Sequence, residues 1–228
     1  GAAIGAANFA KMMSGSKSVQ CKKIFFGHSQ LDFESALFQD MFNQEKSFAN
    51  MEEMLDVLVS SGEIICCYFG GNEIGPRALC NRSIVCAANN KKSVRALNLE
   101  IKKRQGFRPL APVMLRPVAE NWFEINPKVC DCYRWMALTT MAKEKFPVEY
   151  EAVLHVDRTA RVQILDDEMH PLYNFLRRNS GKTDMLVNTS FNVAGDPIVF
   201  DAIDCYVNMS RLGAKYIITD NGLYSLKP

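Results

Sequence analysis

A short apolar run at residues 64–69 most constrains how this chain can fold. The run is six residues long, and Gly70-Gly71 ends it. Continuous apolar runs of this length are typical of strands buried inside a sheet. A membrane-spanning helix needs about 20 apolar residues. Because no apolar run in the chain is longer than this one, the sequence predicts a buried strand and no membrane span.

Helical and strand-like segments alternate along the rest of the chain without a regular βαβ repeat. Apolar spacing and end signals predict helices over residues 1–13, 31–43, 49–61, 91–104, 172–178 and 201–212, the last capped by Asp201. Strands are predicted over 107–115, 153–155, 162–165 and 185–187, with a C-terminal hairpin whose Asp220-Asn221-Gly222 forms a primed turn. The polar residues 14–30 are interpreted as a linker. We therefore expect an α/β (α+β) fold with a twisted mixed sheet.

Composition places the chain among globular proteins. Its 228 residues are 48% apolar and 23% charged, which excludes disorder, collagen and coiled coil as the main architecture. The eight cysteines are too sparse for a disulfide scaffold, and Cys130-Asp-Cys132 has no matching second pair. The three histidines form no paired metal motif. We expect reduced thiols, no metal site and a cytoplasmic protein.

Basic residues are concentrated in one segment. Residues 77–108 hold nine Lys or Arg and one acid, a charge of +8, whereas the remainder holds 18 basic and 24 acidic residues. This asymmetry favours an anionic ligand, and the alternative is a solvated helix face. Nucleic acid is disfavoured because the net charge is only +2 and no aromatic-rich recognition motif lies within the segment.

Two polar segments within or next to this basic region carry candidate ligand-binding residues. Residues 71–83 follow the buried strand and combine glycines and a proline with Arg77 and Arg82, whose guanidinium groups suit phosphate or carboxylate. The alternative is a Gly-Pro turn with surface arginines. Residues 101–112 place three cations at a helix end, where ordinary capping is the alternative. Arg108, between Phe107 and Pro109, should need a partner.

Two further polar segments lie closer to the C-terminus. Residues 155–163 alternate in polarity, and His155 is either a base or a hydrogen-bonded structural histidine. Residues 188–197 end a strand in small hydrogen-bonding side chains. Ser190 and Asn192 share a side if the chain stays extended, and they would then orient a small polar ligand. The alternative is a turn cluster that caps the next element.

Taken together and in order, these segments resemble the C-terminal YrdC-like domain of the O-carbamoyltransferases, a family of nodulation-factor and antibiotic-tailoring enzymes. Residues 75–83 resemble its Gly-Pro-Arg-Ala-Leu-Gly-Asn-Arg-Ser motif, and 101–112 its Ile-Lys-x-Arg and Phe-Arg-Pro-Phe-Ala-Pro motifs. Residues 155–163 resemble His-Val-Asp-Gly-Thr-Ala-Arg-x-Gln, and 188–199 resemble Asn-Thr-Ser-Phe-Asn followed by Gly-Glu-Pro-Ile-Val. The resemblance covers roughly residues 62–228.

The resemblance implies an organisation of the chain. Residues 1–13 are similar to the tail of the family's Kae1-like half, 14–48 would form a linker and connecting helix, and 49–228 the YrdC-like domain. It also implies that this domain makes carbamoyl adenylate from carbamoyl phosphate and ATP, with Mg²⁺ expected beside ATP. A Kae1-like half, in the same longer chain or a separate subunit, would then pass the carbamoyl group to an acceptor hydroxyl.

Site residues follow from the same resemblance. It implies that phosphates are held by Lys102, Arg104 and Arg108 with Arg77. Ser190 and Asn192 would complete the lysine–arginine–serine–asparagine set of YrdC-like domains, which gives the catalytic residues Lys102, Arg104, Arg108, Ser190 and Asn192. The remaining substrate- or ATP-binding candidates are Asn81, Arg82, Arg161, Asn188 and Thr189. Many cations and no Ser-His-Asp arrangement suit a reaction in which anions must be brought together.

Three positions depart from the family's motifs. Cys80 and Arg158 stand where the motifs have glycine, and Asp196 stands where they have glutamate. If the two glycine positions need positive φ, Cys80 and Arg158 alter the backbone or narrow the pocket. Two alternatives therefore stand beside the enzyme: a non-catalytic nucleotide-binding or partner-docking module, and a binder of double-stranded RNA or tRNA, which would bind with a steep salt dependence.

Overall fold

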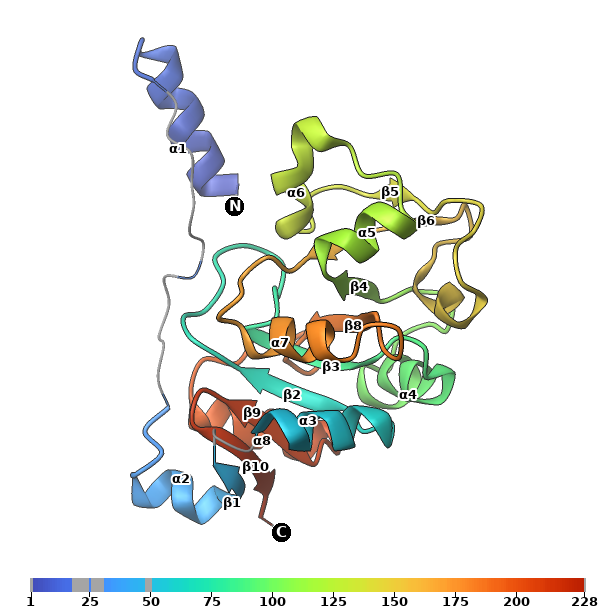
Figure 1. Cartoon of the computed structure of the whole chain (residues 1–228). Helices are drawn as coiled ribbons and strands as arrows, with labels where there is room; N and C mark the ends of the chain where they lie inside the picture. Colours follow the sequence, from blue (N-terminus) through green and yellow to red (C-terminus); the bar gives the residue numbers. More distant parts are fainter. Residues whose placement is uncertain (1, 18–24, 26–30, 48–50, 228) are drawn as a thin grey trace.

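An eight-stranded mixed sheet organises the molecule (Figure 1). The computed structural model describes residues 2–17, 25, 31–47 and 51–227. The strand order is β1 (Phe42–Ser47), β10 (Gly222–Leu226), β9 (Tyr216–Thr219), β2 (Ile65–Tyr68), β3 (Arg82–Ala87), β8 (Met185–Ser190), β4 (Ala111–Met114) and β7 (Gln163–Ile164). The β2–β9 and β4–β7 pairs are parallel and the other pairs are antiparallel. The predicted mixed sheet is confirmed.

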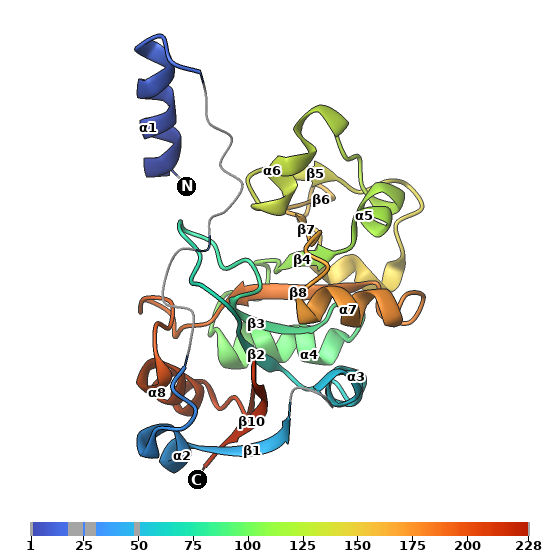
Figure 2. The same ribbon diagram turned by 60° about the vertical axis from the view of Figure 1, so that its left-hand side comes forward.

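Helices cover both faces of this sheet (Figures 1 and 2). One face packs against α3 (Met51–Ser60) and α7 (Pro171–Arg178), and the other against α4 (Lys91–Ala96) and α8 (Ala202–Leu212). Strand β2 explains why both faces are covered. Its Cys66 and Tyr68 belong to the core on the α8 side, and Ile65 and Cys67 to the core on the α3 side. Side chains of a strand alternate between faces, so a continuously apolar strand has two faces to bury.

Shorter elements fill the β4 end of the sheet. They are α5 (Arg116–Trp122), the 3₁₀ turn Pro127–Val129, α6 (Cys130–Arg134), the two-stranded sheet of β5 (Thr140–Met141) and β6 (Thr159–Ala160), and the 3₁₀ turn Val148–Val153. Two helices precede the sheet in the chain, α1 (Ala2–Met13) and α2 (Ala36–Met41). Residues 18–24 and 26–30 of the predicted linker lie outside the described residues.

Several predicted elements differ in the structure. The helix expected over 31–43 is only α2, because the chain then extends into β1, an edge strand whose burial is confined to Phe42. The strand expected over 107–115 shrinks to β4, and the strand expected at 153–155 is wrong, since a 3₁₀ turn ends there. Strand β3 was not predicted.

The C-terminal hairpin is confirmed, but its turn is not of the primed type. Gly222 pairs with Thr219, so Asp220 and Asn221 form the two-residue loop. Neither has a positive φ, which primed turns require. Polar contacts hold the loop instead: Asp220 accepts a hydrogen bond from Gly70 N at 2.8 Å, and Asn221 N donates to the Thr219 hydroxyl at 3.1 Å.

The described residues contain no helix that is long and apolar enough to cross a membrane. The seven described cysteines are all free thiols, and five of them are buried: Cys66, Cys67, Cys80, Cys86 and Cys205. Burial raises the pKa of the Cys66 and Cys67 thiols well above its usual value, so these side chains are inert packing groups.

Candidate anion-binding site

An irregular helix end places the predicted basic residues. Helix α4, capped by the Asn90 side chain, runs into a π-turn at Leu97–Ile101, where Lys102 N donates to Leu97 O at 2.9 Å. Lys103 then takes a left-handed φ of 47°. The wide turn and the left-handed residue redirect the chain, so that 102–108 lies against the end of β8. π-Helical turns are rare, and those that occur lie frequently at functional sites.

Lys102 is the centre of a closed hydrogen-bond network. Its side chain is 1% exposed. Its ammonium donates to Ser190 O at 2.8 Å, to Asn192 O at 2.6 Å and to Asn192 Oδ1 at 2.9 Å. The Ser190 hydroxyl donates to the same Oδ1 at 2.6 Å. The three hydrogens of an ammonium group are thereby all used, so Lys102 fixes the 190–192 segment and contributes its charge.

Burial changes the proton affinity of this lysine. The pKa of Lys102 falls to about 8, chiefly because burial penalises the charged form and also because Arg104 is close. A nearby anion favours the protonated form. We therefore expect a bound anion to increase the fraction of Lys102 that carries a charge.

A basic cavity of about 490 Å³ opens beside this network. Its lining includes all five predicted catalytic residues, Lys102, Arg104, Arg108, Ser190 and Asn192, together with Lys103, Gln105, Ala194 and Gly195. No carboxylate contributes to it. We call it the larger basic cavity.

A smaller basic cavity of about 80 Å³ lies next to the larger one, and Arg104 and Ser190 line both cavities. The lining of the smaller cavity also includes four predicted binding residues, Arg77, Arg161, Asn188 and Thr189. Two buried atoms there have no hydrogen-bond partner among the described residues: Asn188 Oδ1 and Arg161 Nε. Buried polar atoms are almost always paired, so unpaired ones mark a place where a ligand or water completes the bonding.

The cations of the two cavities repel one another. Burial, followed by Arg108, lowers the pKa of Arg104, and burial, followed by Arg77 and Arg104, lowers that of Arg161. None of these arginines forms an ion pair with a described carboxylate. An arrangement of unpaired cations is costly unless an anion neutralises it.

The structure places two predicted site residues elsewhere. Arg82 is fully buried, donates to the carbonyls of Phe69 at 2.7 Å and Gly70 at 2.9 Å, and lies 3.3 Å from the centroid of the Tyr68 ring. It therefore joins β2 to β3 instead of facing either basic cavity. Asn81 donates to Gly71 O at 2.9 Å and lines a different cavity. The sequence motif does not show that Arg82 and Asn81 lie away from Arg77, because these residues differ from Arg77 in burial, which only the structure reveals.

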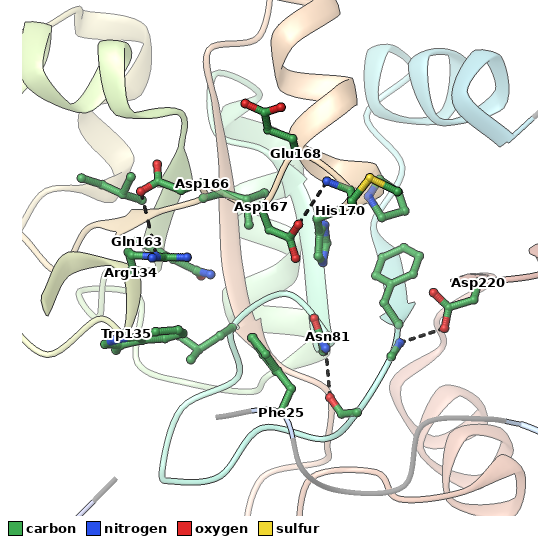
Figure 3. A pocket seen from close by; sticks show the side chains of 18 residues that line it. Phe25, Asn81, Arg134, Trp135, Gln163, Asp166, Asp167, Glu168, His170 and Asp220 are labelled. Atoms are coloured by element: carbon green, nitrogen blue, oxygen red, sulfur yellow. Dashed lines mark hydrogen bonds and ion pairs between the residues drawn. The ribbon is translucent and has the colours of Figure 1, made fainter. Parts of the chain in front are cut away.

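That different cavity is larger, about 680 Å³, but acidic (Figure 3). Four carboxylates line it, Asp166, Asp167, Glu168 and Asp220, alongside Phe25, Trp135 and His170. Arg134 and Arg116 both pair with Asp166. Because several carboxylates would face a phosphate there, this cavity is a poorer anion site than the two basic ones.

Two residues that no sequence motif singles out, Glu73 and Asn98, hold the loops of the site. One Glu73 oxygen accepts the backbone N–H groups of Leu79 at 2.7 Å, Asn81 at 2.9 Å and Arg82 at 3.1 Å, which closes the loop that carries Arg77. Asn98, 6% exposed, donates to Arg108 O at 2.8 Å. No periodicity or motif marks such contacts, since they form only when the chain folds back.

The two departures from glycine fall at left-handed positions. Cys80 has φ 83° and Arg158 has φ 64°, so both positions take the backbone conformation that glycine favours. The condition of the prediction, a positive φ at both positions, is therefore met, and the narrowing of the pocket stays a prediction. His155 lies in the same turn as Arg158, where its Nδ1 is 2.8 Å from the Thr159 hydroxyl. This contact fits the structural reading of the histidine.

The residues that line the two basic cavities are poorly suited to coordinate Mg²⁺ directly. Their lining offers guanidinium, ammonium, amide and hydroxyl groups but no carboxylate, whereas Mg²⁺ sites use carboxylates or substrate phosphates. Among the described residues there is also no group of three or more His, Cys, Asp or Glu side chains that could hold a metal.

Comparison with solved structures identifies the fold. Full-length HypF, in its phosphate- and nucleotide-bound form, superposes on 80% of this chain and 22% of its own, with a TM-score of 0.55 and 18% identity. P. abyssi Sua5, complexed with L-threonine, superposes on 75% of this chain and 46% of its own, with a TM-score of 0.52 and 16% identity. The fold is YrdC-like, as the sequence resemblance implied.

Comparison of sequences identifies the family. NolNO, a nodulation protein of Sinorhizobium fredii, is 36% identical over 64% of this chain and 22% of its own length. The 3'-hydroxymethylcephem-O-carbamoyltransferase of Amycolatopsis lactamdurans is 35% identical over 73% of this chain and 31% of its own. An uncharacterized Synechocystis protein is 33% identical over 80% of this chain and 32% of its own, so the chain spans between about a fifth and a third of the length of these relatives. The family model described as "Carbamoyltransferase C-terminus" matches residues 57–225, and the chain therefore belongs to the carbamoyltransferase family, in its C-terminal region.

Proposed function

We propose that this chain forms carbamoyl adenylate from carbamoyl phosphate and ATP, for transfer of the carbamoyl group to an acceptor hydroxyl by a Kae1-like half. One observation carries the proposal. The larger basic cavity gathers Lys102, Arg104 and Arg108 beside Ser190 and Asn192, with no carboxylate to neutralise the three cations. A site of this kind suits several phosphate groups held together.

The reaction balances with one water molecule. Carbamoyl phosphate and water give carbamate and inorganic phosphate, and a carbamate oxygen then attacks the α-phosphorus of ATP. The bond from that phosphorus to the β-phosphate breaks, and pyrophosphate leaves with the electron pair.

The chain's contribution is positioning and charge. Arg104 and Arg108 offer guanidinium donors to phosphate oxygens, and Lys102 adds positive charge without a free hydrogen of its own. Phosphoryl chemistry of this type depends mainly on such neutralisation and alignment, with no need for a protein nucleophile. Mg²⁺ would be supplied with ATP.

The test is to incubate the chain with Mg–ATP and carbamoyl phosphate and to measure pyrophosphate and carbamoyl-AMP. We expect both products from the wild type, and a loss of about 100-fold or more in Arg104→Gln, because an arginine that neutralises transferring phosphates contributes several kcal/mol. Lys92→Gln, which removes an exposed lysine of α4, is the matched control and should retain activity. A folded wild type that releases neither product, or an active Arg104→Gln, would contradict the proposal.

A further inference from the structure

The cavity of about 680 Å³, which we call the acidic cavity, takes no part in the proposed function (Figure 3). Among the described residues that line it, one is an arginine, Arg134, and it pairs with Asp166. The other carboxylates of the lining, Asp167, Glu168 and Asp220, form no ion pair with a described cation. The acidic cavity therefore keeps an excess of negative charge.

Two of these carboxylates are held in place by the backbone. Asp220 accepts a hydrogen bond from Gly70 N at 2.8 Å, and Asp167 accepts one from Met169 N at 3.1 Å. Because a carboxylate has about four acceptor positions, both keep room for a donor from a ligand. Burial raises the pKa of the Asp220 carboxyl, so a cation beside it would be stabilising. His170 is no such cation, since burial lowers its pKa to about 4.

An amide oxygen points to the same kind of ligand without reference to charge. Asn81 is 7% exposed, and its Nδ2 donates to Gly71 O at 2.9 Å, so its oxygen faces the other way. No described residue donates to that Oδ1, and the atom is not sealed from solvent. Figure 3 shows it turned into the acidic cavity, toward the side where Asp167 and His170 lie. A ligand with an N–H donor would satisfy it.

Apolar side chains form much of the remaining wall of the acidic cavity. They are Phe69, Leu79, Trp135 and Leu165. Aromatic rings also attract cations that lie over their faces. Among the described residues there is no group of three His, Cys, Asp or Glu side chains that could hold a metal ion. Separated acceptors beside an apolar wall suit an organic cation better than a bare ion.

We infer that the acidic cavity binds an organic cation, a protonated amine or guanidine on an apolar body. Its N–H groups donate to Asn81 Oδ1 and to the carboxylates of Asp167 and Asp220. Its apolar body packs against Phe69 and Trp135. The cation is a free small molecule or the basic side chain of a partner polypeptide. The inference does not depend on the proposed function, because the acidic cavity shares no lining residue with the two basic cavities.

The two tryptophans of the chain supply a direct readout. Trp135 lines the acidic cavity, whereas Trp122 lies on α5 and does not. In two-dimensional NMR spectra of the isotope-labelled chain, phenethylamine should shift the indole N–H signal of Trp135 saturably and leave that of Trp122 in place. Phenethyl alcohol, with a hydroxyl in place of the ammonium, should bind about tenfold more weakly, since each exposed ion pair contributes about three- to fivefold. Added salt should weaken only the amine.

Charge-removing variants test the acceptors. Asp167→Asn combined with Asp220→Asn keeps an acceptor for each backbone N–H group and removes both charges, so the preference for the amine should fall to about twofold or less. Asp184→Asn is the matched control, because Asp184 also accepts a glycine N–H at 2.8 Å, that of Gly181, and lies outside the acidic cavity. It should keep the full preference.

Several results would overturn the inference. Equal binding of amine and alcohol by the wild type would do so even if the double variant failed to fold, and so would an intact preference in that variant. A Trp122 signal at its wild-type position shows that a variant is folded. A blocked lysine peptide, whose one cation is the side-chain ammonium, then separates the two sources. If it binds more tightly than phenethylamine, the site takes a polypeptide partner, and if it binds more weakly, the site takes a small amine.

Discussion

At the scale of single residues, Arg158 offers a direct measure of backbone strain. Its φ of 64° lies in the left-handed region, where a side chain costs about 1 kcal/mol relative to glycine. We expect Arg158→Gly to raise the free energy of unfolding by about this amount in urea denaturation. Arg158→Ala is the control, since it removes the charge and keeps the Cβ. Equal stability of the Gly and Ala variants would show that the turn is not strained.

The second residue-scale prediction concerns Lys102, whose pKa is about 8. The lysine loses its charge as the pH rises through this value, so sulfate, whose own charge stays constant, should bind progressively more weakly from about pH 7 to about pH 9.5. Lys102 acts on folding in the opposite direction. Between about pH 8 and pH 10.5 the unfolded chain keeps the proton that the folded chain has lost, so the contribution of Lys102 to stability rises. Calorimetric sulfate titrations should show the decline in the wild type and no step near pH 8 in Lys102→Met. An affinity independent of pH would refute the coupling.

At the scale of elements, sequence patterns predicted what local periodicity controls. The apolar run gave β2, helical spacing gave α3 and α8, and paired apolar segments gave the hairpin of β9 and β10. Strand β3 was not predicted because its first residues, Arg82 and Ser83, have the polarity of a loop. They belong to a strand only because β2 and β8 pair with them. Strand β1 was not predicted either. It is an edge strand with only one buried residue, so its sequence shows no alternation of apolar and polar side chains.

The candidate site also combines features that the sequence predicts with features that only tertiary packing decides. The types of residue in the matched motifs predicted a cluster of cations with Ser190 and Asn192, and the structure brings these together. The motifs could not reveal that Arg82 points into the core or that Asn188 leaves an oxygen unpaired. Those properties depend on which backbone carbonyls come within reach, and tertiary packing alone decides that.

At the scale of the whole molecule, the unpaired cations link folding to ligand binding. An anion that binds only the folded chain adds about 2.7 kcal/mol to its stability at a concentration of 100 times Kd. We expect pyrophosphate to raise the melting temperature of the wild type. Arg104→Gln should melt higher than the wild type without ligand, because Arg104 repels its neighbours, and should gain less from pyrophosphate.

Thermal melts followed by circular dichroism would check this whole-molecule prediction. Lys92→Gln, at an exposed position outside both basic cavities, should behave as the wild type does with and without pyrophosphate. A wild type whose melting temperature does not respond to pyrophosphate would be incompatible with a site built to hold phosphates. Identical responses in wild type and Arg104→Gln would remove Arg104 from that site.

All three hydrogens of the Lys102 ammonium group are used in hydrogen bonds within the chain, and this affects how the ligand selectivity of such a domain can evolve. A charge that acts through space attracts phosphoryl compounds in general and discriminates little between them. Discrimination must then come from short-range contacts made by other side chains, and Asn188 on β8 and Arg161 before β7 line the smaller basic cavity without taking part in the Lys102 network. Mutation at positions of this kind can change selectivity while the buried lysine and its hydrogen bonds stay unchanged, so one scaffold can acquire new ligands in small steps.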